Sequence, residues 1–133
     1  MLPNKEIDRI ELLLNKDKNT QNKYTLKQFD YNIYTAYDLN NESERRIDVN
    51  ISGCNTDEPD NIFLQWIANY PSDWSGIIKI FYKNEENPNL TLNFKKSILN
   101  SYSQSFTDDS GYQQSGYFAA QLIGVVINEV KMS

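Results

Sequence analysis

The residue types that usually perform catalysis are scarce in this sequence. It contains no histidine and a single cysteine, Cys54, so neither a Ser-His-Asp arrangement nor a histidine-activated thiol can form. The commonest zinc ligand is therefore missing, and one thiolate cannot complete a structural zinc site. The five glycines are not grouped as a phosphate-binding loop or a dinucleotide fingerprint. We expect no catalytic residues, no metal and no cofactor, and hence a protein that is not an enzyme.

Two groups of acidic residues are candidates for chemistry, and each has a structural alternative. Asp57, Glu58 and Asp60 could hold calcium, but the spacing and the glycine of an EF-hand loop are absent. Negative charges at this position also suit the positive end of a helix that follows them. Asp108 and Asp109 could pair as acid and base, although adjacent aspartates in a polar stretch are typical of a solvated turn. We favour the structural interpretation for both groups.

Three further features have both a functional and a structural interpretation. Cys54 could be a reactive thiol, but free cysteine is usually a small buried residue, and we expect it to be buried at a strand end. The nine tyrosines could stack on sugars, yet most lie in strand-like segments, which favours core and sheet-surface positions. Arg45 and Arg46 lie beside Glu42 and Glu44. Charges arranged in this way fit an interaction surface and a solvated loop equally well.

Length and charge limit the class of protein. A chain of 133 residues has room for one core, and we assign residues 1–133 to a single domain. The net charge of −5 argues against nucleic acid and against anionic membranes as partners. The first residues do not form a secretory signal, and the apolar stretch 117–127 is too short to span a membrane. We expect synthesis and folding in the cytoplasm.

Alternation of apolar and polar residues predicts a mainly β protein. Arg46–Ser52 alternates strictly and predicts a half-buried strand. Polar loops are expected at 15–22, 38–44, 84–89 and 108–116. Further strands are expected at Glu6–Leu14, Tyr24–Tyr37 with a bulge near Lys27 and Gln28, Gly76–Lys83, Leu90–Leu99, Ser101–Phe106 and Tyr117–Val130. Roughly seven strands around one helix predict a small antiparallel β-barrel or sandwich with a flanking helix.

One segment has helical rather than strand periodicity. Thr56 or Asp57 is expected to cap this helix, and Pro71 is expected to end it. Leu64 falls off the apolar stripe and is expected to face a neighbour. The stripe itself consists of Ile62, Phe63, Trp66, Ile67 and Tyr70, which recur at helical spacing.

The order of motifs between Asp60 and Phe106 is distinctive. An acidic-capped helix containing FLQWI is followed by the glycine-led strand GIIKIFYK, the acidic hairpin NEENPN, the strand LTLNFKKSIL and the segment YSQSF. This succession resembles the Hcp (TssD) tube protein of type VI secretion systems, in the form found in Bacteroidetes. The flanking segments agree in layout, so the resemblance covers about residues 6–130.

The resemblance implies a fold, an assembly and a set of partners. The family fold is a small β-barrel with a flanking helix, related to phage tail-tube proteins. Copies close into hexameric rings with a central channel, and rings stack into the tube that a contractile sheath drives out of the cell. The implied partners are further copies of the chain, sheath and spike components, and effector cargo. Export occurs without a cleaved signal, and no fused effector domain is expected after the last strand.

Two departures from the family pattern concern ring stacking. The loop before the third strand usually carries Gly-Arg-Pro and a glycine pair, whereas residues 38–47 read DLNNESERRI, and the charged C-terminal tail is missing. We expect this loop to contact the next subunit, with its arginines meeting carboxylates there, while the strand Phe118–Ile127 supplies apolar contact. The predicted subunit interface comprises Leu39, Glu42, Glu44, Arg45, Arg46, Asp57, Glu58, Asp60 and Leu64. The alternative function is a monomeric β-sandwich module that binds carbohydrate or peptide through exposed tyrosines.

Overall fold

The computed structural model describes the backbone of residues 6–38, 41–68, 73–108 and 112–132. These residues form mostly strands, with one helix, which confirms the mainly β fold class. The elements are β1 (Ile7–Asp17), β2 (Thr20–Leu26), β3 (Gln28–Asp38), β4 (Asn41–Asn55), α1 (Asn61–Ala68), β5 (Ser75–Tyr82), β6 (Leu90–Phe94), β7 (Lys96–Asp108), β8 (Tyr112–Ile123), β9 (Val126–Ile127) and β10 (Val130–Lys131).

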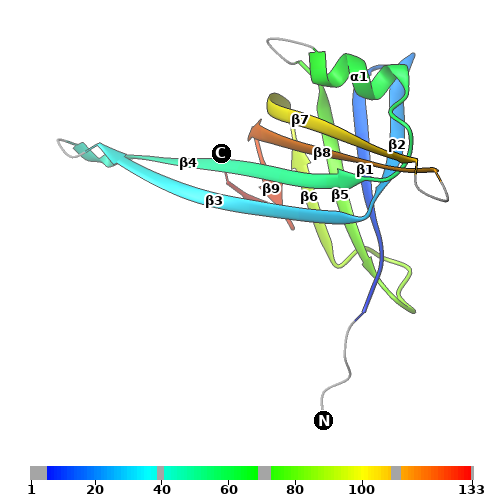
Figure 1. The fold of residues 1–133 in the computed structure, drawn as a ribbon. Coiled ribbons are helices and arrows are strands. Elements are labelled where there is room, and N and C mark those ends of the chain that lie inside the picture. The colour runs from blue at the N-terminus through cyan, green and yellow to red at the C-terminus, as the bar shows by residue number, and fades with distance from the viewer. Residues whose placement is uncertain (1–5, 39–40, 69–72, 109–111, 133) are drawn as a thin grey trace.

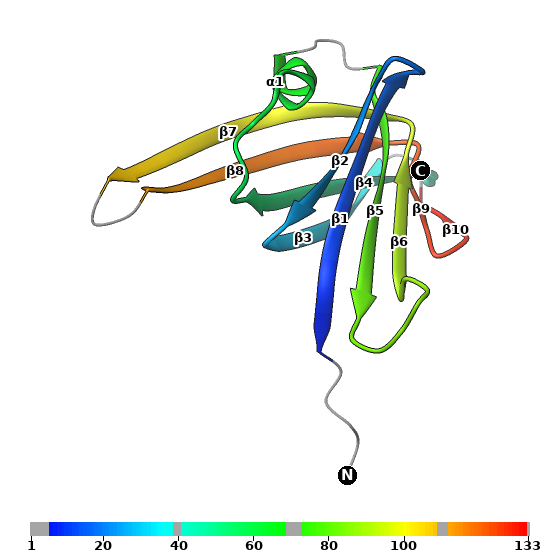
Figure 2. The same ribbon diagram turned by 90° about the vertical axis from the view of Figure 1, so that its right-hand side faces the viewer.

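The strands form two antiparallel sheets that cross each other. The six-stranded sheet has the order β10-β9-β6-β5-β1-β2, and the four-stranded sheet has the order β3-β4-β8-β7. In Figure 1 the strands of the six-stranded sheet run nearly vertically and those of the four-stranded sheet nearly horizontally. Figure 2 shows α1 above β7, at the end of the crossed sheets. No helix in the described part of the chain is long and apolar enough to cross a membrane.

Short bends join consecutive strands that belong to different sheets, with a single residue at two of them and two residues, Gly124 and Val125, at the third. Lys27 lies between β2 and β3, and its amide donates to the Cys54 carbonyl at 2.8 Å. Lys95 lies between β6 and β7, and its amide donates to the Ile123 carbonyl at 2.9 Å. Gly124 has a φ of 71° at the bend that follows β8, a backbone conformation that favours glycine. The chain therefore passes between the sheets without a long connection.

These bends overturn three predictions of continuous strands. The bulge expected in Tyr24–Tyr37 is the boundary between β2 and β3, and Leu90–Leu99 is divided between β6 and β7. Tyr117–Val130 is divided among β8, β9 and β10. The physical reason is that a strand entering a second sheet keeps one face on the common core, so its apolar pattern resumes after the bend with an offset of one residue, as in the step from Leu26 to Phe29.

The bends also close the barrel. Hydrogen-bonded pairing runs from β1 to β2, which continues as β3; β3 pairs with β4, and β4 with β8. From the region of β8 the chain continues as β9, which pairs with β6; β6 pairs with β5, and β5 with β1. β7 and β10 lie outside this circuit, paired with β8 and β9 respectively.

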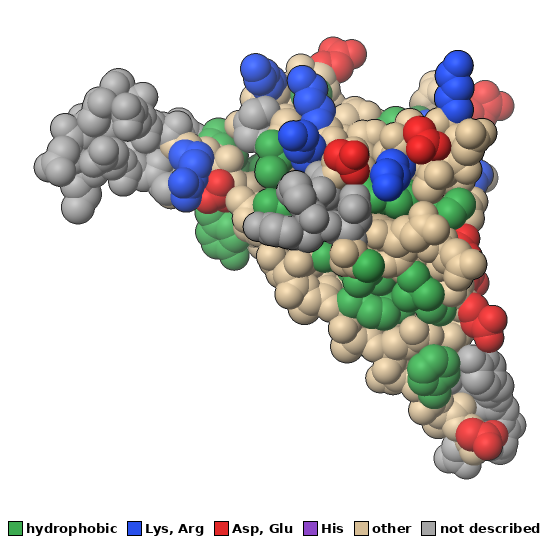
Figure 3. All heavy atoms as spheres, turned by 90° about the horizontal axis from the view of Figure 1, so that it is seen from above, with side chains coloured by type: hydrophobic (Ala, Val, Ile, Leu, Met, Phe, Trp, Pro, Cys, Tyr) green, Lys and Arg blue, Asp and Glu red, His purple; other side chains and the backbone are tan. Residues whose placement is uncertain are grey.

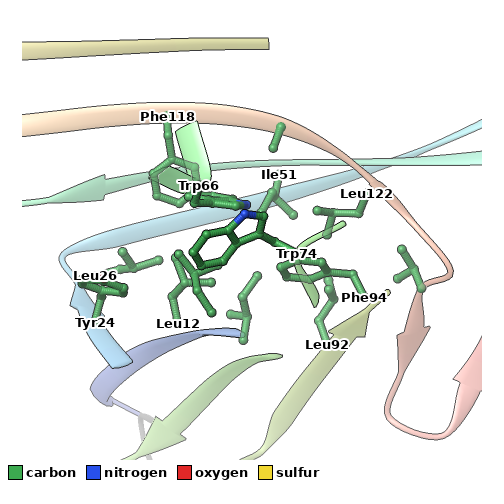
Figure 4. Close-up of a cluster of buried hydrophobic side chains, with 14 of the residues drawn as sticks. Leu12, Tyr24, Leu26, Ile51, Trp66, Trp74, Leu92, Phe94, Phe118 and Leu122 are labelled. Atoms are coloured by element: carbon green, nitrogen blue, oxygen red, sulfur yellow. The ribbon is translucent and has the colours of Figure 1, made fainter. Parts of the chain in front are cut away.

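The hydrophobic core lies between the two sheets (Figure 4). Leu12, Ile78 and Leu92 contribute from the six-stranded sheet, and Val49 and Phe118 from the four-stranded sheet; all are fully or almost fully buried. The sequence predicts that Phe118–Ile127 supplies apolar contact, and within one chain Phe118 and Leu122 face the core while Ile123 on β8 is exposed. The apolar run is long because its final residues have left β8 and entered the other sheet.

The helix α1 begins one turn later than the sequence predicts. Its N-cap is Asp60, whose Oδ1 accepts a hydrogen bond from the Phe63 amide at 2.8 Å, so the prediction of Thr56 or Asp57 is wrong. Phe63 and Trp66 are fully buried, and the Trp66 indole donates to Ser97 Oγ at 2.8 Å. The apolar stripe is confirmed at these two residues. Tyr70, an expected member of the stripe, and Pro71, which was expected to end the helix, lie outside the described residues.

Three segments predicted as polar loops consist partly or mostly of strand. β1 and β2 extend into 15–22, leaving only a short turn, and β3 and β4 extend into 38–44. In the third, 108–116, β7 ends at Asp108 and β8 begins at Tyr112, and residues 109–111 lie outside the described part of the chain. The hairpin of β3 and β4 reaches well beyond the barrel (Figure 1). Polar residues are compatible with a strand there because no second layer covers that part of the hairpin. The hairpin loop expected at 84–89 is confirmed between β5 and β6.

Candidate assembly surface

Cys54 and its surroundings do not form a reactive site. The thiol is free and buried near the end of β4, as the sequence predicts. Among the residues that the structure describes, no three His, Cys, Asp or Glu side chains are grouped so as to hold a metal ion. A hollow with a volume of about 550 Å³ lies on the outer face of the six-stranded sheet. Lys23 is the one ionisable residue among those that line it.

Asp60 holds a structural position within its own chain. Its Oδ1 accepts from the Tyr24 hydroxyl and its Oδ2 from the Asn22 amide, both at 2.7 Å, in addition to the Phe63 amide. Burial acts to raise the pKa of Asp60, but these three hydrogen bonds outweigh it and hold the pKa below its ordinary value. Burial and the Asp60 carboxylate raise the pKa of Tyr24 far above its usual range. The network ties α1 to β2.

The other predicted interface residues lie at two ends of β4. Arg46 is exposed and donates to Asp48 Oδ2 at 3.2 Å on the same strand. Asp57 and Glu58 are exposed just beyond the other end of β4. One chain therefore does not bring Arg46 together with these carboxylates. Leu39 and the side chains of Glu42, Glu44 and Arg45 lie outside the described residues.

The four-stranded sheet has two long free edges. Its outer strands, β3 and β7, are 11 and 13 residues long, and within the described chain neither pairs with a strand on its outer side. The six-stranded sheet ends instead in the two-residue strand β10 and in β2, against which α1 packs. A long unpaired edge presents a row of free amide and carbonyl groups that can pair with another chain.

The two edges are compatible with each other. All three pairings in the four-stranded sheet are antiparallel, so β3 and β7 run in opposite directions. If β7 of one molecule lay beside β3 of a second molecule in the same orientation, the pairing would again be antiparallel. The sheet could then continue from molecule to molecule without a change in its hydrogen-bonding pattern.

The face of this sheet that points away from the core is polar but carries few charges. Asn50 pairs with Gln121 and with Asn32 on this face, and Ser52 pairs with Ala119. Among the described side chains, Asp30, Arg46, Asp48 and Lys96 supply the charges, and Tyr34 and Tyr117 are exposed there. Sequence analysis did not find this surface. The alternation in Arg46–Ser52 gave the polar face of one strand, but not the strands beside it.

Comparison with known proteins adds a decisive observation on the fold. No protein-family model matches the chain, and no curated protein matches its sequence significantly. Solved structures do match. Hcp1 from Flavobacterium johnsoniae superimposes with a TM-score of 0.69 over 92% of this chain and 97% of its own, at 13% sequence identity. The chain has the fold of an Hcp-type tube protein.

Other matches extend this result to related assemblies. The structure of an extracellular contractile injection system, the PVC sheath–tube complex in the extended state, contains a chain with a TM-score of 0.56 at 13% identity, covering 90% of this chain and 88% of its own. A type six secretion system protein matches with a TM-score of 0.55 at 10% identity, covering 83% and 78%. The Hcp resemblance inferred from Asp60–Phe106 is thus confirmed as a likeness of fold over most of the chain.

Proposed function

We propose that this Hcp-type chain is a structural subunit of the inner tube of a type VI secretion system, and that it assembles as hexameric rings. The observation that carries the proposal is the pair of long, oppositely directed free edges, β3 and β7. A ring of identical copies uses two different surfaces of each copy, one meeting the other on the next copy. The β7 and β3 edges provide such a pair, and closing the ring removes both of them.

The arrangement of the crossed sheets supports one orientation of the subunit toward the channel. The six-stranded sheet and the core cover one face of the four-stranded sheet. When four-stranded sheets join edge to edge into a closed wall, the bulkier layer fits on the outside, where the circumference is larger. The polar face with Asn50, Ser52 and Gln121 then lines the channel, through which effectors pass, and the six-stranded sheet faces the sheath.

Charge fixes the orientation of neighbouring copies in this proposal. Because Arg46 and the pair Asp57 and Glu58 lie at opposite ends of β4, Arg45 and Arg46 of one copy meet these carboxylates on a copy placed end to end with it, as in stacked rings. Leu39, Glu42 and Glu44 belong to the same contact. Asp60 contributes indirectly, because its hydrogen bonds hold the start of α1 in place. The subunit has no catalytic role; it is made in the cytoplasm and leaves the cell through the apparatus that it helps to build, together with spike components.

Oligomeric state tests the proposal directly. Light scattering should give a mass near six times 15.5 kDa, and negative-stain microscopy should show rings with a central opening. A protein that stays monomeric at high concentration would contradict the tube-subunit function. A monomer that binds glycans or peptides through Tyr34 and Tyr117, which are 58% and 50% exposed, would instead support the binding-module alternative.

A further inference from the structure

The core side of the four-stranded sheet continues past the core at the β3 edge. Tyr31 and Ile33 pair with Ile51 and Val49 of β4, so all four side chains lie on the core side of the sheet. Ile51 and Val49 are 2% and 0% exposed, whereas Tyr31 and Ile33 are 36% and 42% exposed. The sheet is therefore one strand wider than the layer that covers it. Its uncovered margin consists of apolar side chains that point to the same side as the core.

A second uncovered apolar surface lies at the opposite edge, on α1. The helix packs on the core side of β7, where the Phe63 ring lies 5.8 Å from the Tyr102 ring and Trp66 reaches Ser97. Its outward residues are Asn61, Leu64, Gln65 and Ala68, and Leu64 is 44% exposed. Figure 3 looks onto this end of the molecule and shows hydrophobic side chains grouped on the surface.

The composition of α1 indicates that this surface becomes covered. All eight residues of the helix, NIFLQWIA, are uncharged, although 23% of the chain is charged. A helix face that remains in water usually carries charged side chains, and an apolar surface without them marks a contact site. The core side of β3 has the same character, since Phe29, Tyr31, Ile33 and Thr35 alternate there without a charge.

We propose that α1 of each copy covers the core side of β3 of the next copy, with Leu64 packed on Tyr31 and Ile33. This inference rests on the proposed ring, in which β7 of one copy pairs with β3 of the next. Side chains on one side of a continuous sheet stay on that side from strand to strand. The apolar margin of β3 therefore arrives on the side of β7 where α1 already lies (Figures 1 and 2).

The consequence is a hydrophobic core shared between copies. Within one copy, α1 closes the core beside β7, and β3 is left without cover. In the ring, the helix covers both strands, and the four-stranded sheet gains a complete second layer along its whole width. An apolar centre surrounded by polar groups is the usual anatomy of a stable interface. For an acidic chain whose copies repel one another, neutral surfaces are the ones that can meet without a charge penalty.

Thiol cross-linking distinguishes the two sides of β3. Cys54 is buried, so it is retained in both double-cysteine variants. Ile33→Cys with Leu64→Cys should give a ladder of cross-linked species up to the ring when assembled protein is treated with a short bifunctional maleimide. The matched control is Tyr34→Cys with Leu64→Cys, because Tyr34 is adjacent and 58% exposed but lies on the other side of the strand. The control pair should remain uncross-linked.

A charge substitution gives an independent readout. Ile33→Asp should raise the concentration needed for assembly by about tenfold or more, since it places a carboxylate under Leu64, while Tyr34→Asp should have a much smaller effect. Rings that cross-link through position 34, or that tolerate Ile33→Asp, would overturn the shared core and leave the ring intact. A wild-type protein that forms no rings would overturn this inference and the proposed function together.

Discussion

Replacing Trp66 with alanine removes the side chain on which α1 depends. The indole is fully buried, lies 5.5 Å from the Phe63 ring and 5.4 Å from the Phe118 ring, and donates to Ser97 Oγ at 2.8 Å. It therefore joins the helix to β7 and β8 by packing and by a buried hydrogen bond. We expect Trp66→Ala to separate the helix from the four-stranded sheet and to leave a cavity at the centre of the core.

The magnitude follows from these contacts. Truncating a buried aromatic side chain costs about 3–5 kcal/mol of unfolding free energy. The total free energy of unfolding of a domain is usually about 5–15 kcal/mol, so Trp66→Ala removes a large part of it. Trp66→Phe keeps much of the packing and loses the indole donor, which should cost about 1–3 kcal/mol. The same change on the exposed side of α1, Leu64→Ala, should have a small effect on the unfolding of the monomer.

Urea denaturation measures these differences at a protein concentration low enough to keep every variant monomeric, because assembly raises apparent stability and Leu64→Ala weakens the contact proposed between copies. The expected order of stability is wild type and Leu64→Ala, then Trp66→Phe, then Trp66→Ala. We also expect Trp66→Ala to give little soluble folded protein at 37 °C. A Trp66→Ala variant with an unchanged melting temperature would refute the assignment of Trp66 to the centre of the core.

Four further predictions concern other parts of the molecule. Because the folded-state pKa of Asp60 is lowered, its stabilising effect is complete above the unfolded pKa of about 3.9 and is lost as the pH falls through the folded value. The stability advantage of wild type over Asp60→Asn should shrink correspondingly in denaturation series at decreasing pH; an advantage that is constant with pH would contradict the network. Gly76→Ala should destabilise the fold by about 1–3 kcal/mol, since a Cβ there would lie 2.7 Å from the Leu13 carbonyl oxygen, and calorimetry would measure the loss. Arg45→Glu with Arg46→Glu should give a folded protein that elutes from a sizing column as a smaller species than wild type; unchanged rings would show that these arginines are solvated. Cys54→Ala should assemble like wild type in light scattering, and rapid native-state labelling of Cys54 would contradict its burial.

The sequence reveals the parts of this fold whose signals are local. Phe63 and Trp66 recur at helical spacing, and the buried face of α1 follows from that spacing alone. Strict alternation around Val49 and Ile51 likewise predicts the buried face of β4. The cap was misplaced because Asp57 and Asp60 are both acceptable cap residues, and the choice depends on Tyr24 and Asn22, which are distant in the sequence.

The candidate assembly surface is less visible because it depends on pairing between strands. The positions of β3 and β7 at the edges follow from the order of strands in the sheet, which no single segment encodes. The alternation through Phe29, Tyr31 and Ile33 indicates one apolar face. It does not indicate that the layer beneath that face ends at β4. At Lys27 and Lys95 the alternation shifts by one residue, from Leu26 to Phe29 and from Phe94 to Ser97. Such a shift looks the same in the sequence whether it marks a bulge within one strand or a bend into another sheet.

The bends between the sheets also have a mechanical meaning. At Lys27, Lys95 and Gly124 the backbone itself passes from one sheet to the other. A force on the six-stranded sheet is therefore carried to the four-stranded sheet by covalent bonds at three places, in addition to the packed side chains of the core. Sliding one layer over the other would require these crossings to straighten and the hydrogen bonds at Lys27 and Lys95 to break together. In the proposed tube, these crossings would resist shear between the outer and inner surfaces of the wall.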